Sequence, residues 1–266
     1  MTAWFRVMTY NVRYDNPDDG EHRWSNRREG VADTIRFREP SLLGLQEPLE
    51  HQLSYLREQL PGYEWAGDPR VDGDSEGEYS PVAFDGRRFD LVETDTFWLS
   101  ETPERAGSLG WDARHPRIVT WVRLRDRDTG AVFVHANTHF SHDGPQARRH
   151  SARLLRERLD ELTDDEPVIV TGDFNCIAGE SPHETIVDPD AGRRALSNAI
   201  DRSEHGHYGP ETSVTDFEHL VPNRKIDHVF VTDDVEVRQH GVCTDLFAAE
   251  RYPSDHFPVL AQVRLE

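Results

Sequence analysis

Polar side chains that could bind a metal ion or move a proton stand at the ends of six apolar segments. Each segment has the composition of a buried strand, and each then delivers an amide, a carboxylate or an imidazole. One such residue alone is usually a turn former or a cap. Six ends together indicate strands that aim their side chains into one pocket. These side chains are Asn11, Glu47, Asn137, His139, Asp173, Asn175, Asp227, Asp255 and His256.

The residue types indicate the chemistry of that pocket. Carboxylate and amide oxygens are hard ligands, which suit Mg²⁺ or Mn²⁺ better than zinc. An aspartate beside a histidine suits a general base or a phosphate contact, because the carboxylate orients the imidazole and stabilises its positive charge. The only cysteines, Cys176 and Cys243, are too few for a cysteine-rich zinc site or a disulfide scaffold.

The elements that must position these side chains are mostly strands. Few helices lie between them, which predicts a mixed α/β sandwich. No shift in composition marks a domain boundary, so residues 1–266 are expected to form a single domain. We expect strands at residues 5–12, 41–45, 81–84, 89–100, 119–124, 131–140, 167–174, 226–231 and 257–265.

Three helices are expected between these strands. Asn26 and Glu29 fit a capping box, and the helix that they begin should end before Pro40. Leucines at helical spacing predict the other two helices, at residues 49–60 and from about residue 146 to 162.

The composition limits the functions that the chain can have. Asp and Glu number 50 against 30 Lys and Arg, which gives a formal net charge of −20. Such a surface argues against broad, non-specific binding of duplex nucleic acid, which uses a basic face. With no run of about 18 apolar residues and no signal-peptide pattern, we expect no membrane span and a cytoplasmic monomer. Acidic residues and glycines gather at 68–79, which predicts an exposed loop.

The basic residues are almost all arginines, which is a second informative feature of the composition. Lys225 is the only lysine, and all the other positively charged side chains counted are arginines. A dense carboxylate surface stays hydrated and self-repelling when salt screens it. The surface is therefore typical of a halophilic protein from a salt-rich cytoplasm, and the plain alternative is an acidic protein from an ordinary cytoplasm.

Six short motifs in chain order carry a resemblance to a known family. They are Thr9-Tyr10-Asn11-Val12-Arg13, Gly44-Leu45-Gln46-Glu47, Asn137-Thr138-His139, Gly172-Asp173-Phe174-Asn175, Ile226-Asp227-His228 and Ser254-Asp255-His256-Phe257-Pro258. The set resembles the endonuclease/exonuclease/phosphatase superfamily, which includes DNase I, inositol-polyphosphate 5-phosphatases and nocturnin-like deadenylases. The stretches 96–103 and 110–112 look like those of a small prokaryotic branch of metal-dependent hydrolases.

The resemblance implies a fold and a metal site. The implied fold is a four-layer α/β sandwich (DNase I-like), with two mixed β-sheets packed face to face and helices outside. Its implied activity is Mg²⁺-dependent hydrolysis of a phosphoester at one end of the sandwich, with Mn²⁺ as the other candidate ion. Glu47 would be the main metal ligand, with Asn11 and Asp255 close to the metal or its waters.

The resemblance also implies catalytic roles. Asp173 would orient or deprotonate the attacking water, and Asn175 would hold a phosphate oxygen. His256, polarised by Asp227, would contact the phosphoryl group, and His139 would contact it from the other side.

The chain departs from the branch at two positions. Ser141 stands where the branch tends to have Asp, and His228 stands where it often has Tyr. Both differences leave the chemistry in place and change the expected substrate pocket. Arg117 lies before a strand and could bind a second phosphate or pair with a surface acid. The histidines away from the motifs are expected at the surface: His22, His51, His150, His183, His205, His207, His219 and His240.

Several functions stay open at this point. The substrate could be a phosphomonoester or a phosphodiester, and a nuclease acting on DNA or RNA is the alternative within the superfamily. A thiol amidohydrolase that uses Glu47, Lys225 and Cys176 leaves the Asp–His strand ends unexplained. A non-catalytic binding module predicts erosion of the polar set, yet every position of the set is filled.

Overall fold

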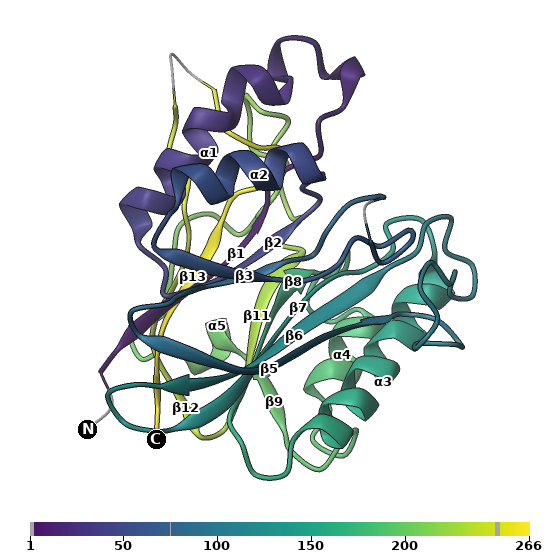
Figure 1. Ribbon diagram of the computed structural model, residues 1–266, viewed down its shortest axis with the longest axis vertical. Helices are drawn as coiled ribbons and strands as arrows, with labels where there is room; N and C mark the ends of the chain where they lie inside the picture. Colours follow the sequence, from purple (N-terminus) through teal and green to yellow (C-terminus); the bar gives the residue numbers. More distant parts are fainter. Residues whose placement is uncertain (1–2, 75, 248–250) are drawn as a thin grey trace.

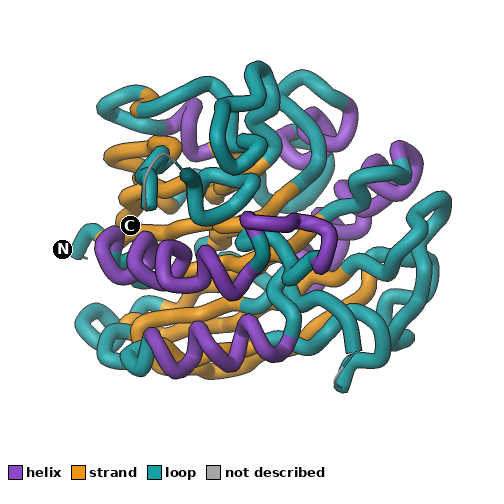
Figure 2. Tube along the Cα trace, turned by 90° about the horizontal axis from the view of Figure 1, so that it is seen from above, coloured by secondary structure: helices purple, strands orange, loops and turns teal. Residues whose placement is uncertain are grey.

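Two β-sheets pack face to face in the computed structural model, which describes residues 3–74, 76–247 and 251–266. Helices lie on both outer faces of this pair (Figure 1), and Figure 2 looks down on the stack with helices in front of the strands. The chain therefore has the four-layer α/β sandwich that its sequence motifs imply. One outer face carries α1 (Trp24–Arg38) and α2 (Glu50–Gln59), and the other carries α3 (Pro145–Leu162) and α4 (Ser181–Val187).

The first sheet has seven strands. The parallel pairing of β1 with β2 sets Asn11 beside Gln46, so Glu47 emerges next to Asn11 at one end of the sheet. In spatial order the strands are β10 (His207–Tyr208), β12 (Val235–Val242), β13 (Val259–Leu265), β1 (Phe5–Asn11), β2 (Leu42–Gln46), β4 (Val82–Asp85) and β3 (Tyr63–Ala66).

The second sheet has six strands. Its register sets Asp173 opposite His139 on one side and opposite Asp227 on the other. Three predicted site residues thus form a row across the end of this sheet. In spatial order the strands are β5 (Phe89–Trp98), β6 (Ile118–Asp126), β7 (Val132–His139), β8 (Val168–Asp173), β11 (Asp227–Thr232) and β9 (Leu196–Asn198).

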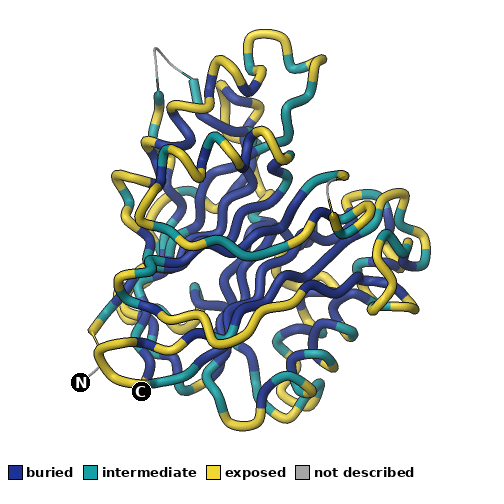
Figure 3. The backbone as a smooth tube through the Cα atoms, in the orientation of Figure 1, coloured by how far each residue is buried: buried dark blue, intermediate teal, exposed yellow. Residues whose placement is uncertain are grey.

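Three apolar clusters hold the four layers together. Val7 and Phe133 pack between the two sheets, Met8 and Ile35 pack between the first sheet and α1, and Leu155 packs α3 onto the second sheet. Figure 3 shows most of the inner strands buried, whereas the edge strand β5 is exposed along much of its length. Full burial of one large apolar side chain contributes roughly 1.5–3 kcal/mol, so the interior anchors the strand ends firmly.

A polar network joins the two sheets beneath the site. Gln46 Nε2 donates to Asn137 Oδ1 at 2.7 Å, and Asn137 Nδ2 donates to the carbonyl oxygens of Leu45 and Pro81. Gly44 leaves room for this network, because a Cβ there would overlap atoms of the Asn137 side chain. Asn137 thus bridges the two sheets.

Of the two ends of α1, the sequence predicts the C-terminal end correctly and the N-terminal end incorrectly. The helix ends before Pro40 as predicted, at a left-handed Glu39. The capping-box prediction is wrong, because α1 begins at Trp24 and Asn26 lies in its first turn. The Asn26 side chain instead donates to the carbonyl oxygen of Glu21, so it ties the helix to the preceding turn.

Several elements are absent from the sequence-based prediction. They are the 3₁₀ helix η1 (Pro17–His22), α4, α5 (Ala199–Arg202) and the strands β3, β9, β10 and β12. The segment 68–79 is exposed at much of its tip, but Pro69 and Tyr79 at its two ends are buried and pair with each other. The predicted loop therefore folds back onto the protein at its base.

Two histidines expected at the surface are buried, namely His183 and His240. Within residues 3–74, 76–247 and 251–266, no helix has the length and apolar character needed to cross a bilayer.

Candidate active site

Most of the predicted polar residues meet around one cavity at the end of the sandwich. The prediction is wrong for Asn137, whose side chain is used up in hydrogen bonds between the two sheets beneath the cavity. The cavity has a volume of about 540 Å³ and receives side chains from both sheets. Asn11 and Asp227 stand behind it and hydrogen-bond to residues of its wall. The wall is formed by Arg13, Tyr14, Glu47, Arg70, Glu78, His115, Arg117, His139, His142, Asp173, Asn175, Arg224, Ile226, Asp255 and His256.

Glu47 is held in place by N–H donors on both of its carboxylate oxygens. Asn11 Nδ2 donates to Oε1 at 2.9 Å, and the backbone N–H of Tyr14 donates to Oε2 at 3.0 Å. Burial works to raise the pKa of Glu47, but these bonds, with the positive charges of His256 and Arg13, bring it below its usual value. Glu47 is therefore an ionised ligand with lone pairs left over for a cation.

Two more carboxylates lie within electrostatic reach of Glu47. Burial raises the pKa of Asp255, and the negative charge of Glu47 adds to this effect. Burial and the charge of Glu47 also raise the pKa of Glu78 to about 7. Arg13 Nη1 lies 3.7 Å from Asp255 Oδ2, and Arg70 pairs with Glu78 at 2.7 Å. A divalent cation beside Glu47 would relieve the mutual repulsion that remains.

The donor set fits a hard divalent ion. Glu47 and Asp255 offer carboxylate oxygens at the cavity wall, which is the ligand type that Mg²⁺ and Mn²⁺ prefer. Asp173, Asp227 and His256 also offer atoms within 4.8 Å of one another. His256 and Asp227 are already hydrogen-bonded to each other, however, so we favour the Glu47 side for the metal.

His256 and Asp227 form a buried ion pair. Nδ1 of His256 lies 2.8 Å from Oδ2 of Asp227, and the Ser213 hydroxyl donates to the same oxygen at 2.6 Å. Burial disfavours the imidazolium, but the charges of Asp227 and Asp173 hold the pKa of His256 well above its usual value. His256 thus presents a protonated Nε2 near Asp173, whose Oδ2 lies 3.8 Å away.

Asp173 is the hub of the site. Asn11 Nδ2 donates to its Oδ2 at 3.1 Å, and the backbone N–H of Asn175 donates to its Oδ1 at 3.0 Å. His139 Nε2 lies 3.4 Å from Oδ2. Burial and the negative charge of Asp227 raise the pKa of Asp173 to about 7. A carboxylate with this pKa can accept a proton near neutral pH.

The turn after β8 places Asn175 at the cavity. Asn175 adopts a left-handed backbone conformation with φ of 49°, and its side-chain amide donates to the carbonyl oxygen of Phe140 at 3.1 Å. His228, one of the two departures from the branch, donates from Nε2 to the carbonyl oxygen of Cys176 at 3.0 Å. Asn198 donates to His228 Nδ1 at 2.9 Å, so His228 anchors this turn from beneath.

His139 differs from His256 in charge. Burial, followed by the positive charges of Arg117 and Arg70, holds the pKa of His139 well below its usual value. The site therefore combines a neutral and a protonated imidazole on either side of Asp173.

A group of basic residues also lines the cavity. We call Arg70, Arg117, His115 and His142 the basic corner; all four line the cavity wall. Arg117 Nη2 donates to His142 Nδ1 at 2.9 Å, and the rings of His115 and His142 stack with centroids 6.3 Å apart. The cavity thus carries both carboxylates, which favour a cation, and arginines, which favour an anion.

Residues 8–256 match the Endonuclease/Exonuclease/phosphatase family. The chain belongs to this family. A family member from Bacteroides vulgatus is 35% identical, with a TM-score of 0.91 and coverage of 99% of this chain and 100% of that one. A mannosyl-6-phosphatase from Bacteroides thetaiotaomicron is 34% identical, with a TM-score of 0.92 and coverage of 97% and 99%.

Curated relatives are more distant. Nocturnin from Drosophila melanogaster is 26% identical over 292 residues, which cover 91% of this chain and 42% of nocturnin. The chain spans 60% or less of the length of the curated relatives that it matches. Besides this family membership, the described residues include a group of Asp and His side chains, Asp173, Asp227 and His256, whose ligand atoms lie close together.

Several residues of the cavity wall could not be predicted from the sequence. Arg70 and Glu78 lie in the segment predicted to be an exposed loop, and the ring of His115 belongs to an irregular stretch. Tyr14 contributes through its backbone N–H, which no side-chain pattern reveals. Arg13 also lines the cavity, and its place as the last residue of the motif Thr9-Tyr10-Asn11-Val12-Arg13 was a signal that could have predicted this.

The cysteine alternative gains no support from the geometry. Of the residues that the structure describes, neither Cys176 nor Lys225 is among those that line the cavity. Burial raises the pKa of the Cys176 thiol to about 12, so it stays protonated and is a poor nucleophile.

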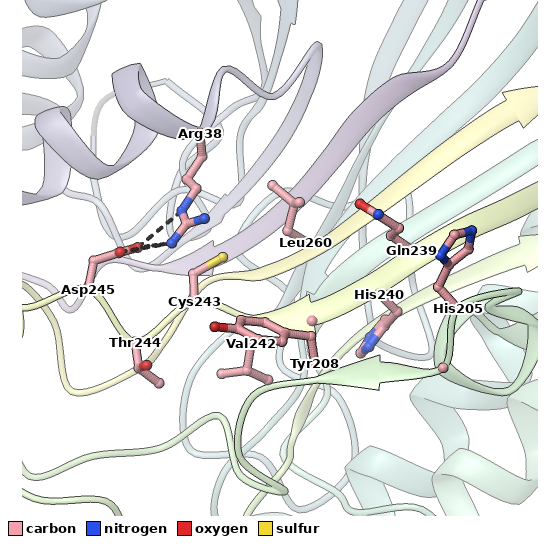
Figure 4. A pocket seen from close by; sticks show the side chains of 12 residues that line it. Arg38, His205, Tyr208, Gln239, His240, Val242, Cys243, Thr244, Asp245 and Leu260 are labelled. Atoms are coloured by element: carbon pink, nitrogen blue, oxygen red, sulfur yellow. Dashed lines mark hydrogen bonds and ion pairs between the residues drawn. The ribbon is translucent and has the colours of Figure 1, made fainter.

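A second cavity of about 350 Å³ lies elsewhere, between the end of α1 and β12. Its conspicuous polar contact is the ion pair of Arg38 with Asp245, at 2.6 Å, so these two charges satisfy each other (Figure 4). None of the predicted site residues lines it.

Proposed function

We propose that this protein is a Mg²⁺- or Mn²⁺-dependent phosphatase that hydrolyses a phosphomonoester of a small polar molecule such as a sugar. The observation that carries the proposal is the polar cavity whose lining includes Glu47, Asp255, His139 and His256. The two carboxylates suit a hydrated divalent cation, and the two imidazoles suit an anionic phosphoryl group.

Asp173 is the proposed general base. Its pKa of about 7 matches the pH range in which a base is both ionised and able to take a proton. It would accept a proton from water while the water oxygen bonds to phosphorus. The bond from phosphorus to the ester oxygen breaks, and the departing alcohol oxygen takes up a proton.

The other side chains act on the phosphoryl group. Protonated His256 donates from Nε2 to one oxygen, and His139 contacts the group from the other side. Asn175 uses one amide N–H for the Phe140 carbonyl oxygen and keeps the second for a phosphate oxygen. A bound divalent cation, held by Glu47 and Asp255, would neutralise charge that develops on the phosphate and the leaving oxygen.

Similarity and cavity size support the substrate class. The mannosyl-6-phosphatase from Bacteroides thetaiotaomicron is 34% identical over nearly the whole chain, and its name describes an enzyme that acts on a sugar phosphate. A cavity of about 540 Å³ is in the size range of small-molecule sites. The net charge of −20 works against long polyanions. We further propose that the enzyme is a monomer in the cytoplasm.

A substrate panel tests the proposal. Hexose 6-phosphates, p-nitrophenyl phosphate, bis(p-nitrophenyl) phosphate and DNA and RNA oligonucleotides are incubated with Mg²⁺, Mn²⁺ or EDTA, and inorganic phosphate and cleavage products are measured. We expect phosphate release from monoesters, lost in EDTA. Cleavage of oligonucleotides without phosphate release from monoesters would favour the nuclease alternative, and activity that persists in EDTA would overturn metal dependence.

A further inference from the structure

Arg117 carries a buried positive charge that the protein leaves without a carboxylate partner. The residue is 4% exposed. Among the residues that the structure describes, no carboxylate oxygen lies within 4.0 Å of its guanidinium. Its Nη2 donates to His142, while its Nε and Nη1 have no hydrogen-bond acceptor. A buried cation is destabilising unless an anion meets it, so this position favours a bound anion.

The neighbours of Arg117 do not supply that anion. Glu78 is already paired with Arg70 at 2.7 Å. The charges of Glu78, Glu47 and Asp173 attract Arg117 from a distance, but the repulsion by Arg70 is stronger than the attraction by any one of them. Because an arginine N–H can only donate, His142 accepts through Nδ1, and neutral His142 carries its proton on Nε2. The basic corner is therefore arranged to meet negative charge that comes from outside the protein.

Arg117 lies close to the phosphoryl position. It lines the same cavity as His139, Asp173 and Asn175. After burial, the charge of Arg117 is the strongest influence that lowers the pKa of His139, which puts the two groups within electrostatic reach. A phosphoryl group held between His139 and His256 would thus have Arg117 at its side.

We propose that Arg117, oriented by His142, selects phosphomonoesters over phosphodiesters, an inference that rests on the proposed function. A monoester dianion has three non-bridging oxygens and a second negative charge. A diester has two such oxygens, one negative charge and a second ester group in the remaining position. The third oxygen of a monoester meets the buried guanidinium, whereas a second ester group brings it no charge. The bonds made and broken are the same for both esters.

Two esters with the same leaving group test this inference. We measure kcat/KM on p-nitrophenyl phosphate and bis(p-nitrophenyl) phosphate with Mn²⁺ for wild type, R117Q, R117K, H142A and the exposed control R105Q. Loss of a hydrogen bond to a charged group predicts an about 30-fold fall for R117Q on the monoester and at most an about threefold change on the diester. R117K should lie between, and R105Q should equal wild type. The inhibition constant of inorganic phosphate should rise with R117Q in parallel.

The outcomes separate the two proposals. Equal loss on both esters, or no loss on the monoester, overturns the role of Arg117 while wild-type monoesterase activity upholds the proposed function. Wild-type protein that cleaves only the diester overturns the proposed function and this inference with it. If R117Q misfolds, H142A still tests the proposal, because His142 is exposed and its replacement should leave the fold intact. It should lose monoester preference at an unchanged melting temperature, and an unchanged preference in H142A contradicts orientation by His142.

Discussion

At the scale of single residues, the charge of His256 depends on one buried oxygen. Asp227 Oδ2 takes the hydrogen bond of His256 Nδ1 at 2.8 Å and that of the Ser213 hydroxyl at 2.6 Å. Since Asp227 is buried, little solvent screens its charge. The pKa of His256 therefore stands well above that of a free histidine, and the side chain stays protonated through neutral pH.

Replacing Asp227 tests this link. The variant Asp227→Asn keeps the shape of the side chain but removes the negative charge, so the pKa of His256 should fall. Because activity requires the imidazolium and is lost as pH rises through that pKa, the alkaline limb of the kcat profile should move to lower pH. The rate should also fall. A profile with slower turnover but unmoved limbs would show that Asp227 does not set the charge of His256.

The sequence alone predicts the site residues that stand at the ends of regular strands. Asp173 ends β8 and Asp227 begins β11, and the apolar residues of both strands can be recognised in the sequence. The two aspartates lie opposite each other because β8 pairs with β11. Ser213 and Arg70 lie in irregular segments, and their positions depend on packing between distant parts of the chain. No local periodicity encodes such a position, so the place of Ser213 and Arg70 at the site could not be predicted from the sequence.

At the scale of elements, the polar network between the sheets depends on the missing side chain of Gly44. A Cβ at this position would overlap atoms of Thr171 and Asn137, which hydrogen-bond to each other at 3.0 Å. Both neighbours are held between two sheets, so they have little freedom to move aside. The network in turn supports the ends of β2 and β8, where site residues emerge.

The variant Gly44→Ala should therefore destabilise the fold by about 1–3 kcal/mol, the usual range for overpacking a core. Urea unfolding measures the change as a lower midpoint at an unchanged m-value. Gly62→Ala is the matched control, because nothing lies within 4 Å of a Cβ there. Equal midpoints for Gly44→Ala and Gly62→Ala would contradict the account of the network.

Element boundaries show the limits of local signals. The end of α1 before Pro40 follows from the chemistry of proline, and it was predictable. Its start was not, because Arg23 caps the helix without a side-chain hydrogen bond and the Asn26 signal was a coincidence. The edge strands β3 and β10 are short, and their pairing partners decide whether they form at all.

At the scale of the whole molecule, the net charge of −20 acts on both stability and substrate binding. The carboxylate surface repels itself and repels an anionic substrate, and both repulsions weaken as the Debye length falls to roughly 3 Å at molar salt. Melting temperature and activity should therefore rise together with KCl. Melting curves at about 0.1 M and about 2 M KCl, with and without Mg²⁺, measure this.

The salt effect should be steeper without Mg²⁺, because the cation neutralises the cluster of Glu47, Asp255 and Glu78. Equal melting temperatures at both salt concentrations would contradict the high-salt interpretation of the surface.

The overall architecture was predictable because six motifs occur in the order of one family, and each sits where two sheets must end together. The substrate was not predictable, because the basic corner is assembled from three separate segments of the chain. They are the segment around Arg70, the stretch just before β6 and the stretch just after β7. Such loops vary in length and course on a constant scaffold, so only the folded chain shows which charges they bring together.

Glu47 is the residue that we propose holds the divalent cation of a phosphoester hydrolase. The most direct test compares p-nitrophenyl phosphate hydrolysis by wild type, Glu47→Gln and the exposed control Glu58→Gln over a range of Mg²⁺ concentrations. Glu47→Gln should lower turnover by orders of magnitude, at an unchanged fold by circular dichroism, while Glu58→Gln should match wild type. Wild-type turnover and Mg²⁺ dependence in Glu47→Gln would remove Glu47 from the metal site and contradict the account.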